Sequence, residues 1–265
     1  MKLQTAAIFL LVIACYLPTD AKESKRNKDS LFQVSTLSAL LEGEYAGRIS
    51  FRQVRKHGNF GLGTFDALDG EMVGLDGKFF QIRADGLATR VHPRMLTPFA
   101  AVTFFNADTT FTVDALSSCE ELRARILRRL PTEDLLYAIK VTGTFSTLQT
   151  RSVHVQEKPY VPLKVALADQ VEFTFDDIEA TLVGFWLPEV LEDVNAAGFH
   201  FHALTADEQA GGHMLDCEVL NATVEIDYMD SLEVAFGTIK RNFKGRKPKN
   251  IGHHRHSKSG HMVQW

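Results

Sequence analysis

The sequence has only three cysteines among its 265 residues, too few for a scaffold that depends on disulfide bonds. Its 18 glycines and 8 prolines are ordinary proportions, which excludes a collagen-like or low-complexity chain. After residue 17 no apolar run approaches the roughly 18 residues that a membrane-spanning helix needs. Apolar residues make up 45% and charged residues 23%, the balance of a globular protein with a substantial core.

Charge is distributed unevenly along the chain. The formal net charge is −4, yet residues 238–265 contain eight Lys or Arg residues and no acidic residue. Residues 1–29 carry a further +2, so residues 30–237 carry −14. An acidic body argues against nucleic acid as a ligand and offers no long-range attraction for an anionic substrate. Any anionic substrate must therefore be bound by local cationic groups.

The N-terminus has the pattern of an export signal. Lys2 precedes an apolar run over 6–17, and Thr19 and Ala21 place small residues at positions −3 and −1 of a cleavage site. Because this run is too short to span a membrane, we expect residues 1–21 to be a signal peptide and the protein to be secreted. A buried N-terminal helix is one alternative. The segment 12–15 also resembles a bacterial lipobox, in which Cys15 carries a lipid anchor.

Two further segments are polar, and two cysteines remain after cleavage. Residues 22–29 are predicted to be a linker, and 238–265 a basic, disordered tail of low hydrophobicity and high charge. Adhesion to an anionic polymer or loose metal binding are alternatives for this tail. Cys119 and Cys217 either pair in an oxidising compartment or lie buried as free thiols.

The body of the chain is rich in strand patterns and poor in helix patterns. Helices are predicted over 35–45 and 117–130, the second bounded by a serine cap and Pro131. Apolar patterns predict strands over 48–54, 99–105, 137–145, 171–185, 199–204, 213–219 and 222–228. The pairs Asp69-Gly70 and Asp76-Gly77 predict hairpin turns. The fold class is therefore a β-rich α/β protein with few helices and two sheet-bearing domains, 30–155 and 156–237, divided where prolines interrupt regular structure.

Three histidines have the spacing of a metal site. His200 and His202 alternate along one predicted strand, so both point to the same face. A turn over 207–212 brings the next strand back with His213 near its start. Three imidazoles that leave a coordination position open are typical of catalytic zinc, a Lewis acid. A hairpin without metal is the alternative, and the glutamate that cupins usually place shortly after H-x-H is absent.

Two charged residues are candidates to act beside this metal. Glu71 ends the glycine-rich stretch 58–72, whose backbone can approach a ligand closely. Arg151 lies in a segment with alternating character, before a pair of prolines. Taken alone, these patterns favour a solvated hairpin acid for Glu71 and a strand-face cation for Arg151.

Four segments resemble the alpha-acetolactate decarboxylase family. They are FGLGTFDALDGEM (60–72), TRSVHVQEKPYVPL (150–163), TLVGFW (181–186) and above all GFHFHALTADEQAGGHMLD (198–216). The similarity extends from about Ser30 to about Ala235. It implies two sheet-bearing domains, frequent dimerisation, and a zinc lyase that converts 2-acetolactate to acetoin and carbon dioxide.

The same resemblance implies roles for individual residues. The resemblance implies that the zinc ligands are His200, His202 and His213. It implies that Glu71 and Arg151 are an active-site glutamate and arginine. It also implies that Leu62 and Thr64 belong to the segment that lines the substrate. The family can also bring a C-terminal glutamate to the metal, whereas the last acidic residue here is Glu233. Glu233, another carboxylate or water must take that place.

Two other functions remain open from the sequence. One is a non-catalytic secreted relative that binds a partner through its basic tail. The other is a different zinc enzyme with three histidine ligands, which needs either a glutamate after H-x-H or a general base beside the metal.

Overall fold

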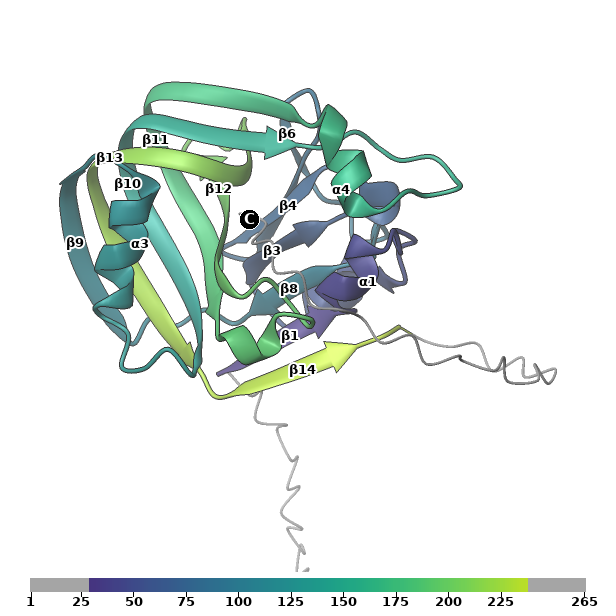
Figure 1. The fold of residues 1–265 in the computed structure, drawn as a ribbon, viewed down its shortest axis with the longest axis horizontal. Coiled ribbons are helices and arrows are strands. Elements are labelled where there is room, and N and C mark those ends of the chain that lie inside the picture. Colours follow the sequence, from purple (N-terminus) through teal and green to yellow (C-terminus); the bar gives the residue numbers. More distant parts are fainter. Residues whose placement is uncertain (1–28, 238–265) are drawn as a thin grey trace, which may run out of the picture.

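The structure is a computed structural model, which describes residues 29–237. The predicted signal peptide, residues 22–28 of the predicted linker and the basic tail lie outside the described residues. Two β-sheets lie against each other in this part of the chain, as Figure 1 shows, with the five-stranded sheet on the left and the seven-stranded sheet on the right. The predicted β-rich fold with two main sheets and few helices is confirmed.

The seven-stranded sheet combines strands from both ends of the described chain. In spatial order its strands are β14 (Ser231–Ala235), β1 (Ser30–Val34), β8 (Ala100–Thr103), β3 (Phe60–Thr64), β4 (Glu71–Leu75), β5 (Lys78–Ile82) and β6 (Ala88–Arg90). Only β14 and β1 pair in parallel. Asp76 and Gly77 join β4 to β5 with φ values of 49° and 76°, so this predicted hairpin is confirmed. Asp69-Gly70 instead ends the longer connection from β3 to β4.

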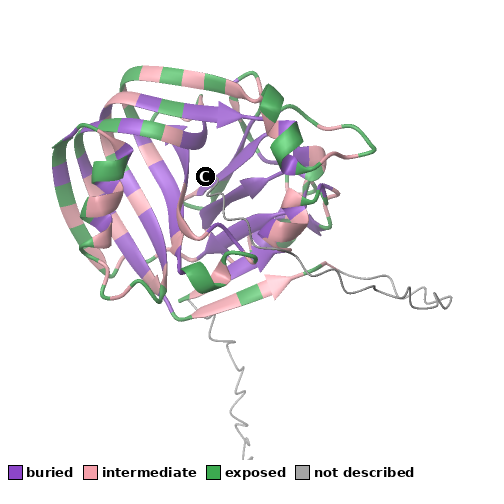
Figure 2. Cartoon of the chain, viewed as in Figure 1, coloured by how far each residue is buried: buried purple, intermediate pink, exposed green. Residues whose placement is uncertain are grey.

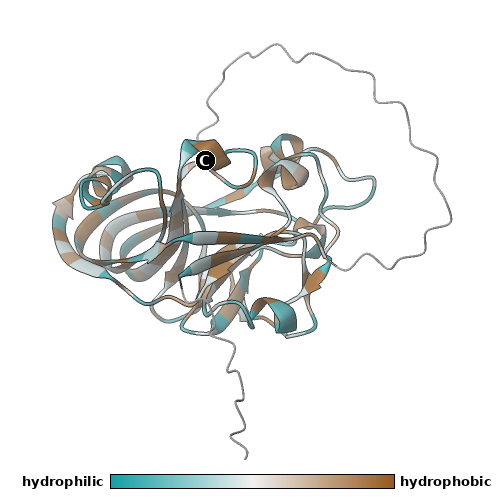
Figure 3. Ribbon diagram, turned by 90° about the horizontal axis from the view of Figure 1, so that it is seen from below, coloured by the Kyte–Doolittle hydropathy of each residue, from teal (hydrophilic) through white to brown (hydrophobic). Residues whose placement is uncertain are grey.

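The five-stranded sheet is antiparallel and curls back on itself. Its strands are β9 (Thr109–Leu116), β10 (Leu136–Ser152), β11 (Val171–Leu187), β12 (Gly198–Thr205) and β13 (Gly211–Met229). The long strand β13 pairs with β9 and β10, and its first residues also pair with β12. The two strands predicted over 213–219 and 222–228 are therefore one strand. Hydrophobic and hydrophilic bands alternate along this sheet in Figure 3, as a two-residue period requires.

Helices are short and lie outside the sheets. The α-helices are α1 (Leu37–Leu41), α2 (Phe51–Val54), α3 (Cys119–Leu127) and α4 (Leu163–Ala166); the 3₁₀ turns are η1 (Asp66–Leu68), η2 (Leu167–Asp169) and η3 (Glu189–Leu191). A two-stranded sheet joins β2 (Ile49–Ser50) to β7 (Leu96–Thr97). The helices predicted over 35–45 and 117–130 form in their central parts. No helix within 29–237 is long and apolar enough to cross a membrane.

The prediction of a strand over 48–54 is correct for β2 (Ile49–Ser50) and wrong for the residues that form α2 (Phe51–Val54). Phe51 and Val54 are fully buried and lie three residues apart, which is the spacing of one helical face. The side chain of Gln53 also accepts a hydrogen bond from the Ser50 backbone N–H, as in a capping box. This local capping favours α2 over continued strand.

The sheets do not divide at residue 155. Strands β9 and β10 precede that residue but belong to the five-stranded sheet, while β14 follows it and pairs with β1 in the seven-stranded sheet. The prolines near 158–163 fall in an excursion between Ser152 and Val171, which are themselves directly paired. The chain therefore leaves and rejoins one pair of strands at the prolines, and no new sheet begins there.

An apolar core between the sheets holds them together. It combines Leu62 and Val73 of the seven-stranded sheet with Val183 and Phe185 of the five-stranded sheet, all at most 1% exposed. A second core packs α3 onto the other face of the five-stranded sheet. Figure 2 shows the strands nearest the sheet interface as almost wholly buried.

A disulfide bond joins Cys119 of α3 to Cys217 of β13, the pairing that the sequence left open. The two cysteines are 98 residues apart in sequence. Closing so long a loop restricts the unfolded chain strongly. We therefore expect Cys119→Ala combined with Cys217→Ala to lower the free energy of unfolding by about 2–5 kcal/mol, measured by denaturant titration. Reductant should lower the wild-type value similarly; an unchanged value in both cases contradicts the pairing.

Asp227 on β13 is a buried carboxyl group that forms no ion pair with a basic side chain among the described residues. It is 1% exposed and accepts a hydrogen bond from the Asn106 N–H at 3.0 Å. Burial raises the pKa of Asp227 from 3.8 to about 7; the Asn106 N–H opposes this shift, and nearby carboxylates add to it. Because its pKa is higher in the folded state, stability falls as the pH rises from about 4 to about 7.

We expect Asp227→Asn to raise the melting temperature at pH 8 and to have little effect near pH 4. The asparagine keeps an acceptor for Asn106 and removes the desolvated charge, which wild type carries only at the higher pH. Thermal melts at the two pH values measure the difference. Asp176→Asn, at an exposed position of β11, is the matched control. An equal effect of Asp227→Asn at both pH values contradicts the assignment.

Candidate active site

Three strands of the five-stranded sheet place a row of polar side chains on one face. His202 of β12 lies directly opposite His213 of β13, and His213 lies opposite Arg151 of β10. Directly opposite residues share one face of a sheet. His200 precedes His202 by two residues and therefore points the same way. The histidine cluster predicted from the hairpin is formed by the structure.

A bulge and a glycine shape the strands beside this row. The register of β10 against β13 shifts between Gln149 and Thr150, next to Arg151, and bulges of this kind re-aim side chains. Gly212 has a φ of +136°, and a Cβ atom there would lie 2.5 Å from the Arg151 carbonyl oxygen. Only glycine allows this approach without a shift of β10 or β13. The second glycine of the Gly-Gly pair therefore belongs to the strand rather than to the turn.

The three imidazoles converge closely. Their ring centroids lie 5.0–5.2 Å apart, and one potential ligand atom from each lies within 4.8 Å of the others. His202 Nδ1 lies 2.9 Å from the Met72 carbonyl oxygen, so Nδ1 donates and leaves Nε2 as the free acceptor. His200 Nε2 and His213 Nδ1 are 3.2 Å apart. The His200 Nδ1 atom is buried and has no hydrogen-bond partner among the described residues.

The surroundings keep these imidazoles neutral. Burial, followed by the nearby Arg151 guanidinium, lowers the pKa of His200 to about 3. Burial also lowers the pKa of His202 and His213 well below 6.5, with Arg151 and neighbouring histidines adding to the effect. Neutral imidazole is the form that binds metal. Three neutral imidazoles that each bring a nitrogen to one point fit a bound metal ion, and the three histidines can hold one.

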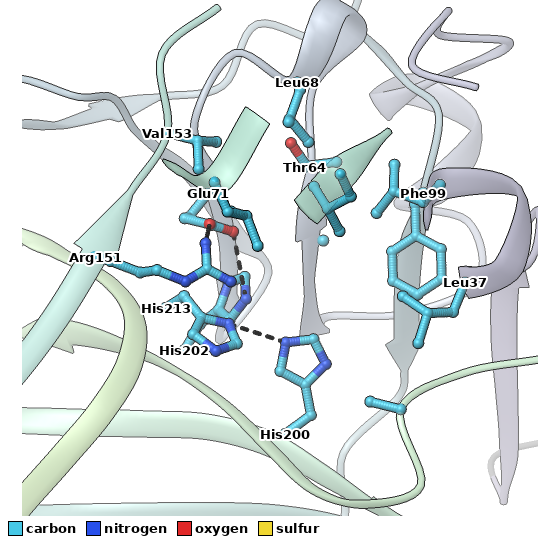
Figure 4. A pocket seen from close by; sticks show the side chains of 15 residues that line it. Leu37, Thr64, Leu68, Glu71, Phe99, Arg151, Val153, His200, His202 and His213 are labelled. Carbon is cyan, nitrogen blue, oxygen red and sulfur yellow. Dashed lines mark hydrogen bonds and ion pairs between the residues drawn. The ribbon is translucent and has the colours of Figure 1, made fainter. Parts of the chain in front are cut away.

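Glu71 comes from the opposite sheet and meets this row. Its Oε1 accepts a hydrogen bond from Arg151 Nη1 at 2.8 Å, and its Oε2 lies 3.5 Å from His202 Nε2. Glu71 is 7% and Arg151 8% exposed, so neither is the solvated surface charge that its local pattern favours. Burial raises the pKa of Glu71, although the Arg151 charge and hydrogen bond oppose the shift. Figure 4 shows both side chains beside the histidines.

The cavity at this site has a polar side and an apolar side. Thr64 lines it as predicted, and its hydroxyl donates to the Gly70 carbonyl at 2.7 Å. The remaining lining residues are mainly apolar and come from many elements: Leu37, Leu40, Gly63, Leu68, Phe99, Val153, Leu163, Leu167 and Ala196. Figure 4 places Leu37 and Phe99 across the cavity from Arg151. Sequence reasoning missed this wall because no local motif links its members.

Two residues expected at the site, Leu62 and Glu233, lie elsewhere in the structure. Leu62 is not among the residues that line the cavity; it is 0% exposed and packs in the core between the sheets. Glu233 lies on the edge strand β14, is exposed, and pairs with Phe32. It therefore does not supply the C-terminal acid of the family. Among the described residues Glu71 is the one carboxylate that lines the cavity.

Comparison with known proteins agrees with this geometry. The family model described as alpha-acetolactate decarboxylase matches residues 31–248. The chain belongs to this family of carboxy-lyases. A family member from Methanosarcina mazei is 45% identical over 204 residues, which cover 77% of this chain and 71% of the relative. One from Bacillus licheniformis is 41% identical over 201 residues, covering 76% and 79%.

Solved structures of family members share the fold. The crystal structure of the Bacillus subtilis strain 168 alpha-acetolactate decarboxylase aligns with a TM-score of 0.78 at 37% identity, covering 82% of this chain and 93% of that chain. A Staphylococcus aureus protein of unknown function similar to this family aligns with a TM-score of 0.76 at 33% identity, covering 78% and 89%. Membership of the alpha-acetolactate decarboxylase family thus rests on sequence and on structure.

Proposed function

We propose that the protein converts 2-acetolactate to acetoin and carbon dioxide with zinc bound by His200, His202 and His213. One observation carries this proposal: three neutral imidazoles and a buried Glu71–Arg151 pair meet at one cavity. Three nitrogen ligands with an open position suit catalytic zinc. Family membership supplies the substrate class, and the donor set supports the metal.

The reaction breaks the bond between the carboxylate carbon and C2 of the substrate. The electron pair left behind forms an enolate-type anion conjugated with the ketone, and C2 then accepts a proton to give acetoin. Bound zinc supplies Lewis-acid stabilisation of negative charge on the substrate oxygens. The side chains of this chain must therefore bind the carboxylate, exclude water and manage one proton.

Arg151 is suited to bind the substrate carboxylate. A guanidinium has five N–H donors in a planar fork, and the hydrogen bond to Glu71 uses one of them. The arginine is 8% exposed, so little water competes with a carboxylate beside it. Because the body of the protein is acidic, this local cation provides the anion binding that long-range charge does not.

Glu71 is suited to hold the proton that C2 receives. Burial raises its pKa and so favours the protonated form, while the Arg151 hydrogen bond orients Oε1. The apolar wall formed by residues such as Leu37 and Phe99 faces the methyl groups of the substrate and keeps water from the anion. The polar side of the cavity therefore carries the reacting groups, and the apolar side packs against the substrate.

Metal content tests the zinc part of this proposal. The purified protein is first stripped of metal with a chelator and then dialysed against a low concentration of zinc. It should take up and retain about one zinc per chain. His154→Ala, at an exposed position outside the cavity lining, should retain the same amount. A wild-type chain that retains no zinc contradicts the proposal. Zinc retention with no acetoin formation instead favours the non-catalytic relative.

We also propose that the chain is exported. The signal pattern of residues 1–21 supports this, as does the disulfide bond, since such bonds persist in oxidising compartments. The protein recovered from culture medium should begin at Lys22. A lipid-bearing N-terminal Cys15 supports anchoring instead, and an intact Met1 contradicts export.

The family resemblance further implies a homodimer. Light scattering of the purified protein should give twice the mass of one mature chain. A mass equal to one chain contradicts this proposal.

A further inference from the structure

Two side-chain amides are buried where the cavity wall meets the seven-stranded sheet. Gln33 of β1 is 0% exposed, and Asn195, between η3 and β12, is 1% exposed. The Asn195 Nδ2 donates to Gln33 Oε1 at 2.7 Å. The Gln33 Nε2 donates to the carbonyl oxygens of Ser35 and Val194 at 2.8 and 2.7 Å. Asn195 Oδ1 accepts from the Ala196 N–H at 2.7 Å.

This network joins two parts of the cavity wall. The Val194 carbonyl oxygen also accepts the Leu37 N–H at 2.8 Å, so the start of α1 and the segment before β12 share one acceptor. Leu37 and Ala196 both line the cavity. The amides therefore fix a backbone segment whose neighbours form the wall of the site, while neither amide lines the cavity itself.

The same segment leads directly to His200, four residues after Ala196. His202 is oriented by its own ring, because Nδ1 donates to the Met72 carbonyl oxygen. The His200 Nδ1 atom has no corresponding partner among the described residues. The other ring nitrogen, Nε2, lies 3.2 Å from His213 Nδ1, and the His200 backbone pairs with Phe185 of β11, so the entry of the chain into β12 is a further constraint on where the ring points.

We propose that Gln33 and Asn195 are positioning residues for the metal centre. They hold residues 194–196 against β1 at the entry to β12, and thereby support the direction in which the paired strands β11 and β12 place His200. The inference rests on the proposed metal site. An apolar pair at these positions would leave the Ser35 carbonyl and the Ala196 N–H without their side-chain partners, so the amides tie this backbone together. A role in placing the segment accounts for amides at these two positions.

Zinc affinity separates positioning from simple stability. In the zinc-loaded protein we compare Asn195→Leu, the double variant Gln33→Met with Asn195→Leu, and the control Ile226→Ala. Ile226 is fully buried in the core beneath α3 and is remote from the cavity lining. Competition with a chromophoric chelator gives the zinc dissociation constant, and thermal melting gives stability. The readout uses no acetolactate.

We expect both amide variants to bind zinc about 10- to 100-fold more weakly. Ile226→Ala should lose stability but keep the wild-type zinc affinity. The double variant should also lose stability, because the Ser35 carbonyl and the Ala196 N–H lose their side-chain partners, so its weaker zinc binding is what separates it from Ile226→Ala. Wild-type zinc affinity in the double variant overturns the proposal. Because zinc is measured directly, absence of acetoin formation by wild type overturns the proposed function but leaves this comparison intact.

Hydrogen exchange of the wild-type chain keeps the proposal testable if the variants do not fold. In the metal-free protein the Ala196 N–H should exchange as slowly as strand amides of β12, because Asn195 already fixes it. Rapid exchange at Ala196 that becomes slow only with zinc overturns the proposal, since the metal then orders the segment.

Discussion

The variant His202→Ala is expected to lose bound zinc and to decarboxylate 2-acetolactate at least about a thousandfold more slowly. The metal is expected to contribute several kcal/mol of stabilisation to the developing anion, and each 1.4 kcal/mol is a factor of ten in rate. Of the three proposed ligands, His202 is 1% exposed and has its ring oriented by the Met72 carbonyl. Metal analysis and acetoin formation on one sample measure both effects.

Alanine at His202 also removes a large buried side chain, so folding must be monitored. The circular dichroism spectrum of His202→Ala should stay close to that of wild type, because the sheets are held by separate apolar cores. The exposed His154→Ala is the matched control and should keep both zinc and turnover. A folded His202→Ala protein with wild-type turnover shows that the histidine cluster is not the metal centre of this reaction.

Glu71→Gln is expected to keep zinc but to lower turnover by about 10²- to 10⁴-fold. Glutamine has nearly the same shape, and its amide oxygen still accepts the hydrogen bond from Arg151 Nη1. It has no carboxyl group to carry a proton, so the proton assigned to Glu71 cannot be delivered. Turnover at saturating substrate together with zinc content measures the two effects separately.

The pH profile provides a second readout for Glu71. Burial raises the pKa of this carboxyl, so wild-type turnover should fall at high pH as Glu71 loses its proton. The residual activity of Glu71→Gln should lack that fall. Glu44→Gln, which alters an exposed carboxyl group, should retain the wild-type rate and profile. Full turnover by Glu71→Gln contradicts the proton-carrying role.

The histidine cluster was predictable from the sequence because its information is local. Two histidines alternate on one strand, and the third follows after a short turn, so strand geometry alone brings them together. Glu71 and Arg151 lie 80 residues apart in sequence, and their patterns alone favour solvated charges. Only the family resemblance joined them to the metal site. Their burial depends on how two sheets pack, which no short segment encodes.

The parts of the fold that the sequence did not predict are long-range pairings. The β-rich class follows from alternating residues, yet the final strand β14 returns to pair with β1 across most of the chain. The sheet boundary predicted at 155 failed because β10 and β11 pair again after the excursion through the prolines. Leu62 was expected at the substrate because of the family resemblance; its place in the core between the sheets depends on the packing of β3, which the glycine-rich pattern does not encode.

The central claim is that the histidine cluster holds a zinc ion that this chain needs to decarboxylate 2-acetolactate. Its most direct test is acetoin release from racemic 2-acetolactate by the purified protein, before and after zinc removal by a chelator. The account predicts release above the spontaneous rate, loss of that release after zinc removal, and recovery when about one zinc per chain is restored. Acetoin release that persists unchanged in the zinc-free protein contradicts it.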